Sequence, residues 1–577
     1  MSIIQKDIAE IKTKEKRVSI RSENIRSLFF SLLVIIAVNM LGSHYFMRLD
    51  LTSEKRFTLT PATRQLLSEL DDFVYFQVYL EGDFPAGFKR LRNQTREMLD
   101  EFRAYSSFIQ YEFINPTVKG DWERTEENYT MLVRKGLQPT QLQVTAEDAS
   151  SQQIIFPGAI AGFRGREAPI SLLQEQMGMS SEHVINNSAQ ALEYNLASAI
   201  HKLTQEAKPR IAFLEGNGEL EFRYVADITY SLEEYYEVDR LQINGDPLAL
   251  EGISTIVVAQ PMEEYSEADK FVIDQFIMNG GSALWLIDPV FASMDSLQVA
   301  PETLGMAFSV NLEDMLFRYG VRLNSDLVMD MQSTPIPITT GFMGDRPQIS
   351  LIPWFYFPLV TPASDHPVVR NLNAVRTEFV STIDTVAAEG IRKTFLLQSS
   401  PYTRVVQTPA RISFDIMQTQ VDESLYRAGP KPVAVLLEGQ FSSVFANRRS
   451  PVDQLPANFQ RRDQGEPSAM IVVADGDIIR NQFDSRRQPL PLGYDRFLDE
   501  TFGNSDFILN AINYLNDDRG IMESRAREIR LRLLDRSRVN QNRLAIQMMN
   551  VALPVVLLLL FGFARFYLRK RKYAGKI

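Results

Sequence analysis

The chain has 577 residues, of which 45% are hydrophobic and 23% are charged, a balance typical of folded proteins rather than disordered ones. It contains no cysteine, which excludes disulfides, cysteine-ligated metal sites and cysteine nucleophiles. The formal net charge of −11 disfavours nucleic acid as a partner.

The charges are distributed unevenly, and an apolar run borders each basic end. Residues 1–26 carry seven Lys or Arg against four acidic residues, and residues 565–577 carry six basic residues and no acidic one. The apolar runs at 27–47 and 544–564 are each about 20 residues long, enough to cross a bilayer as a helix. We therefore predict two transmembrane helices. A cleaved signal peptide is the alternative for the first run, and the lack of a small-residue cleavage motif disfavours it.

The basic ends also predict the topology. Because positively charged flanks stay in the cytoplasm, both tails are expected to be cytoplasmic. The acidic region between the two runs is then an ectodomain in the periplasm. The protein is expected in the inner membrane of a bacterial cell, in contact with membrane lipid.

Residues 48–205 are expected to form the first periplasmic domain. A helix begins at Thr60-Pro61, with Thr as its N-cap and Pro at its first position. Strand-like and helix-like runs then follow in the order β-α-β-α-β-β-α, ending in a strand at 154–163 and a long amphipathic helix at 181–203. This order is that of a thioredoxin-like α/β unit, and a generic α+β domain is the alternative. Without cysteine, the redox chemistry that this fold often hosts is excluded.

Residues 206–520 are expected to form the second periplasmic domain. Short apolar strands alternate with helices, which predicts a doubly wound α/β unit, Rossmann-like or amidotransferase-like, with a parallel sheet. Ser266 is placed to cap one of the helices. Between about 305 and 430 the alternation loosens, which predicts an insertion. The predicted strands cover 210–214, 238–243, 254–259, 283–287, 432–437 and 468–474.

A glycine-rich loop follows the first strand of the second domain. It is located where phosphate-binding loops occur, but the third glycine of that motif is replaced by Glu221, and nearby acids would repel a phosphate. We interpret the loop as a structural turn or as a contact loop for a partner or ligand. The candidate contact residues are Glu215, Gly216, Asn217, Gly218 and Glu219.

Two further segments are candidate partner contacts. An aromatic run lies between prolines in the second domain, and its side chains either enter the core or contact a partner. The basic segment 521–543 precedes the second apolar run and either contacts lipid headgroups or a partner subunit, or is a solvated helix face. The candidate contact residues are Trp354, Phe355, Tyr356, Phe357, Arg532, Arg536 and Arg538.

Catalytic and nucleotide-binding motifs are absent from the sequence. It has neither a Gly-x-Ser-x-Gly elbow nor the Gly-Lys-Ser/Thr of a phosphate-binding loop. We therefore expect a non-catalytic protein with no cofactor and no catalytic or metal-ligating residue. Any ATP-derived energy must come from a partner.

Several sequence blocks spread over the whole chain are distinctive: RLDLT (48–52), FTL (57–59), YLEGDFPAGFKRLRNQTREMLDEFRAY (79–105), FLEGNGE (213–219), GGSALWLIDP (280–289) and LRLLDRSRVNQNR (531–543). Together they resemble the GldG family of gliding-motility-associated ABC-transporter auxiliary proteins of Bacteroidota. The resemblance implies a subunit that works with a permease (GldF-like) and a cytoplasmic ATPase (GldA-like), and it implies no catalytic residue. A membrane-tethered ligand-binding protein is the alternative function, and an enzyme is the least favoured.

Overall fold

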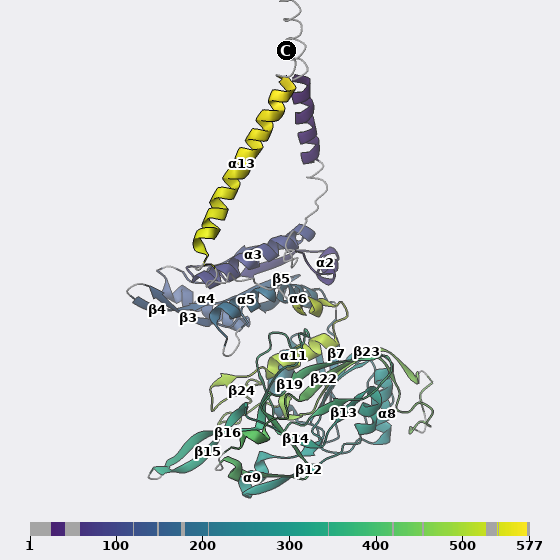
Figure 1. Ribbon diagram of the computed structural model, residues 1–577. Coiled ribbons are helices and arrows are strands. Elements are labelled where there is room, and N and C mark those ends of the chain that lie inside the picture. The colour runs from purple at the N-terminus through teal and green to yellow at the C-terminus, as the bar shows by residue number, and fades with distance from the viewer. Residues whose placement is uncertain are drawn as a thin grey trace, which may run out of the picture. The chain divides into compact units, whose positions relative to one another are not determined.

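The chain forms two compact units in a computed structural model (Figure 1). One unit comprises Met1–Arg56 with Glu528–Ile577, and the other is Phe57–Arg527, the predicted ectodomain. The structure describes residues 25–40, 58–118, 120–146, 149–174, 179–205, 207–343, 346–417, 421–452, 455–457, 459–526, 539 and 542–573.

The apolar ends form helices of unequal length. The C-terminal run lies in α13 (Arg543–Tyr573), which continues into the predicted cytoplasmic tail and contains Pro554. Its segment Arg543–Arg571 is long and apolar enough to cross a membrane. The N-terminal run forms the shorter apolar helix Ile25–Met40, and the rest of its predicted span lies outside the described residues. Of the two predicted spans, the described residues therefore contain one of full length and one shorter helix.

The first domain is built around a four-stranded sheet with the order β2-β1-β5-β6. β1 pairs in parallel with β2 and antiparallel with β5, and β5 pairs antiparallel with β6. As predicted, Thr60 caps the first helix, its Oγ1 accepting a hydrogen bond from Thr63 N. The elements are α2 (Pro61–Ser68), β1 (Val74–Val78), α3 (Ala86–Tyr105), β2 (Ile109–Phe113), α4 (Trp122–Arg134), β3 (Thr140–Ala146), β4 (Ala149–Ile155), β5 (Gly158–Phe163), β6 (Arg166–Ser171), α5 (Ser181–Gln190) and α6 (Leu192–Thr204).

Two predicted elements of this domain are divided. The strand predicted over 154–163 is interrupted by a tight turn, in which Gly158 N donates to Phe156 O at 2.8 Å. Its first part belongs to β4, which pairs with β3 in a separate hairpin, and its second part is β5 of the main sheet. The helix predicted over 181–203 ends at Ala191 and restarts as α6.

The second domain contains a large sheet of two halves. One half is parallel, with the order β8-β7-β9-β10-β23, and the other continues antiparallel through β22, β19, β16 and β15. The predicted insertion is therefore not a separate lobe, because β16 and β19 extend the sheet. The main elements are β7 (Arg210–Glu215), η1 (Phe222–Tyr224), α7 (Ala226–Glu233), β8 (Glu237–Gln242), β9 (Thr255–Ala259), α8 (Glu267–Met278), β10 (Ser282–Leu286), β22 (Pro432–Ser442), β23 (Gln464–Val473), η4 (Asp477–Ile479) and α11 (Asn504–Leu515).

The middle of the chain adds further strands. The long β15–β16 hairpin projects from the rest of the domain (Figure 1). Small sheets join β11 to β12 and β21, β13 to β18, and β14 to β20. These elements are β11 (Val290–Phe291), α9 (Met294–Val299), β12 (Glu302–Ala307), α10 (Glu313–Tyr319), β13 (Val321–Leu323), β14 (Asp326–Asp330), β15 (Ser333–Met343), β16 (Arg346–Pro362), β17 (Val375–Arg376), β18 (Ile383–Thr385), β19 (Ile391–Gln398), β20 (Thr403–Gln407) and β21 (Ala410–Ser413).

Helices cover both faces of the parallel half of this sheet. Along β7, Ile211 and Phe213 pack into the core that includes side chains of α7 and α11. Ala212 and Leu214 pack into the opposite core, with side chains of α8 and α10. Burial on both faces explains why these strands read as continuous apolar runs in the sequence.

The C-terminal end of the unit Phe57–Arg527 packs against its N-terminal end. η5 (Ile521–Ala526) contributes Ile521 and Met522 to the core of the first domain, which also contains Leu66 of α2. Just after α2, Glu69 forms an ion pair with Arg519. The segment predicted to begin at residue 521 as a juxtamembrane stretch is therefore folded over its first six residues.

Arg525 of η5 contacts both domains and is only 9% exposed. Its guanidinium donates hydrogen bonds to Asn510 Oδ1 of α11 and to Arg370 O. The same group lies 5.5 Å from the ring centre of Tyr194 in α6. One side chain of η5 thus contacts both the first and the second domain.

Candidate functional site

A cavity of about 820 Å³ lies at one edge of the parallel half of the large sheet. Leu220, Gln260, Asp288 and Asp477 line it, and they follow β7, β9, β10 and β23 respectively. The carboxyl ends of parallel strands meet at this edge. The chain leaves β7 for β8 on one side and later enters β9 on the other, and ligands of α/β proteins generally bind at such a switch point.

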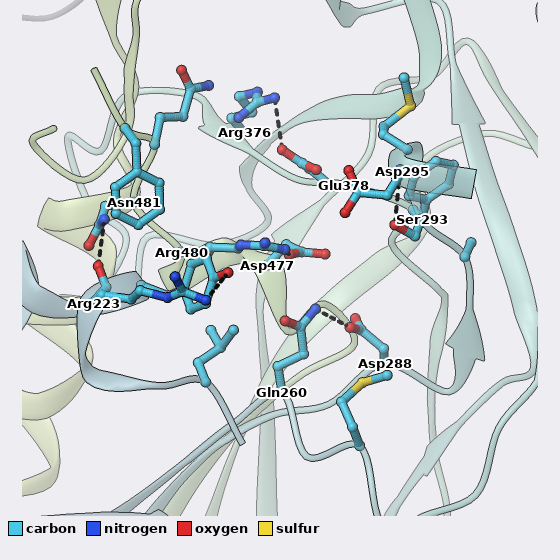
Figure 2. A pocket seen from close by; sticks show the side chains of 18 of the residues that line it. Arg223, Gln260, Asp288, Ser293, Asp295, Arg376, Glu378, Asp477, Arg480 and Asn481 are labelled. Atoms are coloured by element: carbon cyan, nitrogen blue, oxygen red, sulfur yellow. Dashed lines mark hydrogen bonds and ion pairs between the residues drawn. The ribbon is translucent and has the colours of Figure 1, made fainter. Parts of the chain in front are cut away.

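The cavity lining carries charges of both signs together with aromatic rings. Arg376, Glu378, Arg480 and Asp477 are grouped around it in Figure 2. The arginines are Arg223, Arg376, Arg480, Arg487 and Arg496; the acids are Asp288, Asp295, Glu378, Asp477 and Asp484; the aromatic residues are Tyr224, Phe291, Phe308, Phe379, Phe483 and Phe497.

Carboxyl groups gather at the strand ends. Asp288 accepts hydrogen bonds from Gln260 Nε2 at 2.8 Å and from Gly476 N at 2.6 Å. Its burial, with the nearby charge of Asp477, raises the pKa of Asp288 to about 7. Gly476 is needed for this approach, because a Cβ there would lie 2.6 Å from the Gln260 side chain and 2.9 Å from Asp288 Oδ2.

A second carboxyl lies fully buried behind the cavity. Asp475 accepts hydrogen bonds from Glu378 N at 2.9 Å and from Asp477 N at 2.8 Å. Burial, followed by the charge of Asp288, raises the pKa of Asp475 well above its ordinary value. Burial likewise raises the pKa of Glu378, although Arg376 lies 2.8 Å away and opposes the shift. Asp475 therefore ties the segment around Glu378 to the loop that follows β23.

Arginines and tyrosine form one wall. Arg480 Nη1 lies 3.1 Å from Asp477 Oδ1, and its guanidinium carbon lies 4.6 Å from the ring centre of Tyr224. The guanidinium of Arg223 is also 4.6 Å from that ring centre, and Arg223 Nη2 donates to Tyr224 Oη at 2.9 Å. The faces of aromatic rings attract cations, so Tyr224 holds both guanidinium groups at the cavity.

Asn481 supplies a buried polar group to the cavity. The residue is 2% exposed, its backbone N donates to Tyr224 O at 2.8 Å, and its Nδ2 donates to Arg223 O at 3.1 Å. Its Oδ1 is buried and has no hydrogen-bond partner within the part of the chain that the structure describes. A buried acceptor of this kind is normally paired, so the cavity offers an unused acceptor to an occupant.

Metal binding is not indicated at this site. Across the described ranges, no three His, Asp or Glu side chains are arranged to hold a metal ion. The carboxyl groups of the cavity instead accept hydrogen bonds from backbone N–H groups, an amide and two arginines. The arrangement is suited to binding a polar organic molecule.

The predicted contact loop is bonded to the connection between β9 and α8. Asn217 O accepts hydrogen bonds from Met262 N and Glu263 N at 2.9 and 2.8 Å, and Glu219 accepts from Tyr265 Oη. Glu215 Oε1 accepts from Arg240 Nε at 2.5 Å. Gly216 and Gly218 have φ values of 115° and 75°, which favour glycine. The loop residues 215–219 are thus bonded within the protein, and the cavity lining begins at Leu220.

The other candidate contacts differ in their placement. The four aromatic side chains of the predicted contact run all lie in one hydrophobic core and are at most 9% exposed: Trp354, Phe355, Tyr356 and Phe357. Of the two interpretations of this run, the structure shows burial in the core. Two earlier residues of the same strand are exposed instead, Ile349 by 59% and Leu351 by 44%. Arg532, Arg536 and Arg538 lie outside the described residues.

Among the described residues, none of the candidates named from the sequence lines the cavity. Asp288, Asp475 and Asp477 stand directly after apolar strands, and this strand-end position is the signal that could have found them. Arg376 and Glu378 come from the middle of the chain, where no local pattern marks them. Asn481 follows a short 3-10 turn, and its role depends on burial that the sequence does not display.

Two family models match different parts of the chain. A family model described as an ABC-type uncharacterized transport system matches residues 208–511, and a domain of unknown function matches residues 53–162. An uncharacterized protein of Borreliella burgdorferi is 20% identical over 563 residues, which cover 96% of this chain and 99% of that protein.

One solved structure is similar at a low level. The mmIFT52 N-terminal domain is 12% identical, with a TM-score of 0.30, and the match covers 53% of this chain and 96% of that chain. A TM-score of that size does not establish a shared fold. The family model, by contrast, covers the cavity and its supporting strands and more than half of the chain. The chain therefore belongs to the auxiliary-component family of an ABC-type uncharacterized transport system.

Proposed function

We propose that this auxiliary component is a non-catalytic, membrane-anchored subunit that acts with a multispanning permease and a separate cytoplasmic ATPase. The observation that carries the proposal is the family match across the second domain, joined to a helix, α13, that is long enough to cross a membrane. The described residues contain one full-length apolar helix and one shorter one, which we take to be too few to form a transport pathway. The sequence has no phosphate-binding loop, so ATP hydrolysis belongs to another subunit.

The more specific role that we propose rests on the sequence blocks that resemble the GldG family. Their resemblance to GldG supports a role in gliding motility beside a GldF-like permease and a GldA-like ATPase of a Bacteroidota cell. The proposed topology has the ectodomain in the periplasm and both tails in the cytoplasm, as the basic residues at both ends favour.

The strand orders support a fold for each domain. The order β2-β1-β5-β6, with only β1 and β2 parallel, is that expected of a thioredoxin-like unit with the β3–β4 hairpin added. The parallel order β8-β7-β9-β10-β23 supports a Rossmann-like unit, extended by an antiparallel half. We propose that both folds act here as scaffolds.

Affinity purification tests the assembly. The tagged full-length protein, extracted in a mild detergent, is expected to retain a multispanning permease and an ATPase, identified by mass spectrometry. A variant in which Arg543–Arg571 is replaced by an unrelated apolar helix of equal length is the control, and it is expected to lose the permease. If the unaltered protein purifies alone in several detergents, the proposal is wrong.

A membrane-tethered ligand-binding protein is the second candidate function. The cavity favours it, because a volume of about 820 Å³ with convergent polar groups is typical of small-molecule sites. The two functions are compatible, since a transport subunit can also recognise a solute. Stabilisation of the full-length protein by a bound solute would support this function.

A further inference from the structure

The charges of the cavity restrict which ligands it can hold. Five arginines and five acidic residues line it, so their formal charges cancel. A polyphosphate or a polyamine would meet as many like charges as opposite ones, and the cavity as a whole would not attract it. The lining is complementary to a molecule that is neutral overall.

Four charges of the lining are already paired, Arg376 with Glu378 and Arg480 with Asp477. The remaining charges include Asp288, which is half-buried at the ends of the strands, and Arg487 and Arg496, which are exposed. Within the described residues, neither of these two arginines forms an ion pair with a carboxylate, and Asp288 forms none with an arginine or a lysine. A ligand with a positive group at one end and a negative group at the other matches this separation of charge.

Asn481 adds a requirement for a hydrogen-bond donor. Its buried Oδ1 has no partner among the described residues, whereas its own backbone N and Nδ2 donate to Tyr224 O and Arg223 O. An occupant that reaches this depth must therefore present an N–H or O–H group to satisfy it. The backbone N–H groups of a peptide are donors of this kind.

Aromatic rings line the same opening. Phe497 is 41% exposed, and Phe483 packs edge-on against Tyr224 with ring centres 5.5 Å apart. Both line the cavity. Exposed rings in a charged cavity favour a ligand that also carries an apolar side chain.

We propose that this cavity binds a zwitterionic ligand of the peptide class, whose ammonium group lies near Asp288 and one of whose backbone N–H groups faces Asn481. Its carboxylate faces Arg487 and Arg496, and its side chain lies on the rings of Phe483 and Phe497. The proposal rests on the ligand-binding function given above and names the ligand class. A neutral polyol would satisfy Asn481 but would gain nothing from the separated charges.

Isothermal titration calorimetry on the full-length protein in detergent tests the proposal. The probes are alanyl-phenylalanyl-alanine with free termini, its N-acetyl and C-amide derivatives, and maltotriose. The free tripeptide is expected to bind, each blocked derivative at least about tenfold more weakly, and maltotriose not at all. Equal binding of free and blocked peptides would overturn the proposal.

Two variants separate direct contact from a folding defect. Arg487→Gln is expected to weaken the free tripeptide and to leave the affinity for the C-amide unchanged, because the amide has no carboxylate to lose. Asn481→Leu is expected to weaken all three peptide probes, because each of them loses an acceptor for a backbone N–H group. Arg392→Gln, in an exposed ion pair with Glu438 outside the cavity, is the matched control and is expected to change none of these affinities.

The remaining outcomes distinguish the two levels of the proposal. If maltotriose binds and the peptides do not, the ligand-binding function stands and the peptide class is wrong. If no probe binds at millimolar concentration, the zwitterion proposal is overturned. Membership of a transport complex is tested separately by the affinity purification described above.

Discussion

Asp288 connects the geometry of the cavity to the pH dependence of folding. The pKa of its carboxyl is about 7 in the folded protein, whereas an Asp in an unfolded chain titrates near 3.9. Between these values the folded state binds more protons than the unfolded state, so this group's contribution to stability falls as pH rises. The decrease is complete above the folded pKa.

We predict that Asp288→Asn stabilises the protein at neutral and mildly alkaline pH. Asparagine keeps an acceptor for Gly476 N and carries no charge to bury, so the gain is roughly 2 kcal/mol at about pH 8. The gain is expected to shrink steadily as pH falls toward about 5. Thermal melts followed by scanning fluorimetry at several pH values measure it.

Asp384→Asn is the control, because the pKa of Asp384 is shifted in the opposite direction to that of Asp288. Arg322 lies 2.5 Å from Asp384 and lowers the pKa of that carboxyl. Its contribution is present above the unfolded pKa and is lost only as pH falls below about 4, so the variant loses a small, constant amount between about pH 5 and pH 8. A constant difference for Asp288→Asn as well would contradict the role given to its pKa.

Gly439 of β22 and Gly390, which directly precedes β19, lie next to each other where these two strands pair. A larger residue is disfavoured at each of them for a different physical reason. Gly439 of β22 pairs with Ile391 of β19, and a Cβ on it would lie 2.2 Å from Gly390 O. Gly390 has a φ of 74°, and a Cβ there would meet nothing within 4 Å. Gly439 is thus constrained by a backbone contact and Gly390 by its dihedral angle alone.

We predict that alanine lowers the folding stability much more at Gly439 than at Gly390. Gly439→Ala must displace a backbone carbonyl and is expected to lose more than about 3 kcal/mol of stability. Gly390→Ala carries only the conformational penalty, about 1 kcal/mol. Thermal melts of the two variants test this, and equal losses would mean that the strands separate easily.

η5 is the element that connects the domains through Arg525. Arg525→Ala removes hydrogen bonds to Asn510 and Arg370 and the contact with Tyr194, for an expected loss of about 2 to 4 kcal/mol. Hydrogen exchange should accelerate in both α6 and α11. Arg519→Ala, which breaks an exposed ion pair, should cost less than about 1 kcal/mol. Faster exchange in α11 alone would argue against a bridging role.

Elements with strong local signals could be predicted, and elements defined by distant partners could not. Ser266 signalled the start of α8, and its Oγ accepts a hydrogen bond from Asp269 N at 3.1 Å. β6 was missed because Glu167 and Pro169 break its apolar pattern, and its pairing with β5 defines it. The cavity joins Arg223 to Arg376 and Arg496, residues whose proximity depends on the whole sheet order.

The whole chain offers a clean test of topology, because it contains no cysteine. Single cysteines at Ser2, Ser485 and Lys576 can be labelled with a membrane-impermeant maleimide without background. We predict labelling of Ser485→Cys in cells with a permeabilised outer membrane, and labelling of the two terminal variants only after the inner membrane is disrupted. Labelling of Lys576→Cys without that disruption would place the C-terminal tail outside the cytoplasm.

The ion pair between Glu69 and Arg519 has an evolutionary consequence. It brings the first and last parts of the folded unit Phe57–Arg527 together, although 450 positions separate them in the sequence. A folded region whose ends are adjacent can be inserted into a loop of another protein without forcing the flanking segments apart. The unit therefore has the form of a transferable cassette. A gene can acquire such a region, or exchange it for another, in a single insertion event.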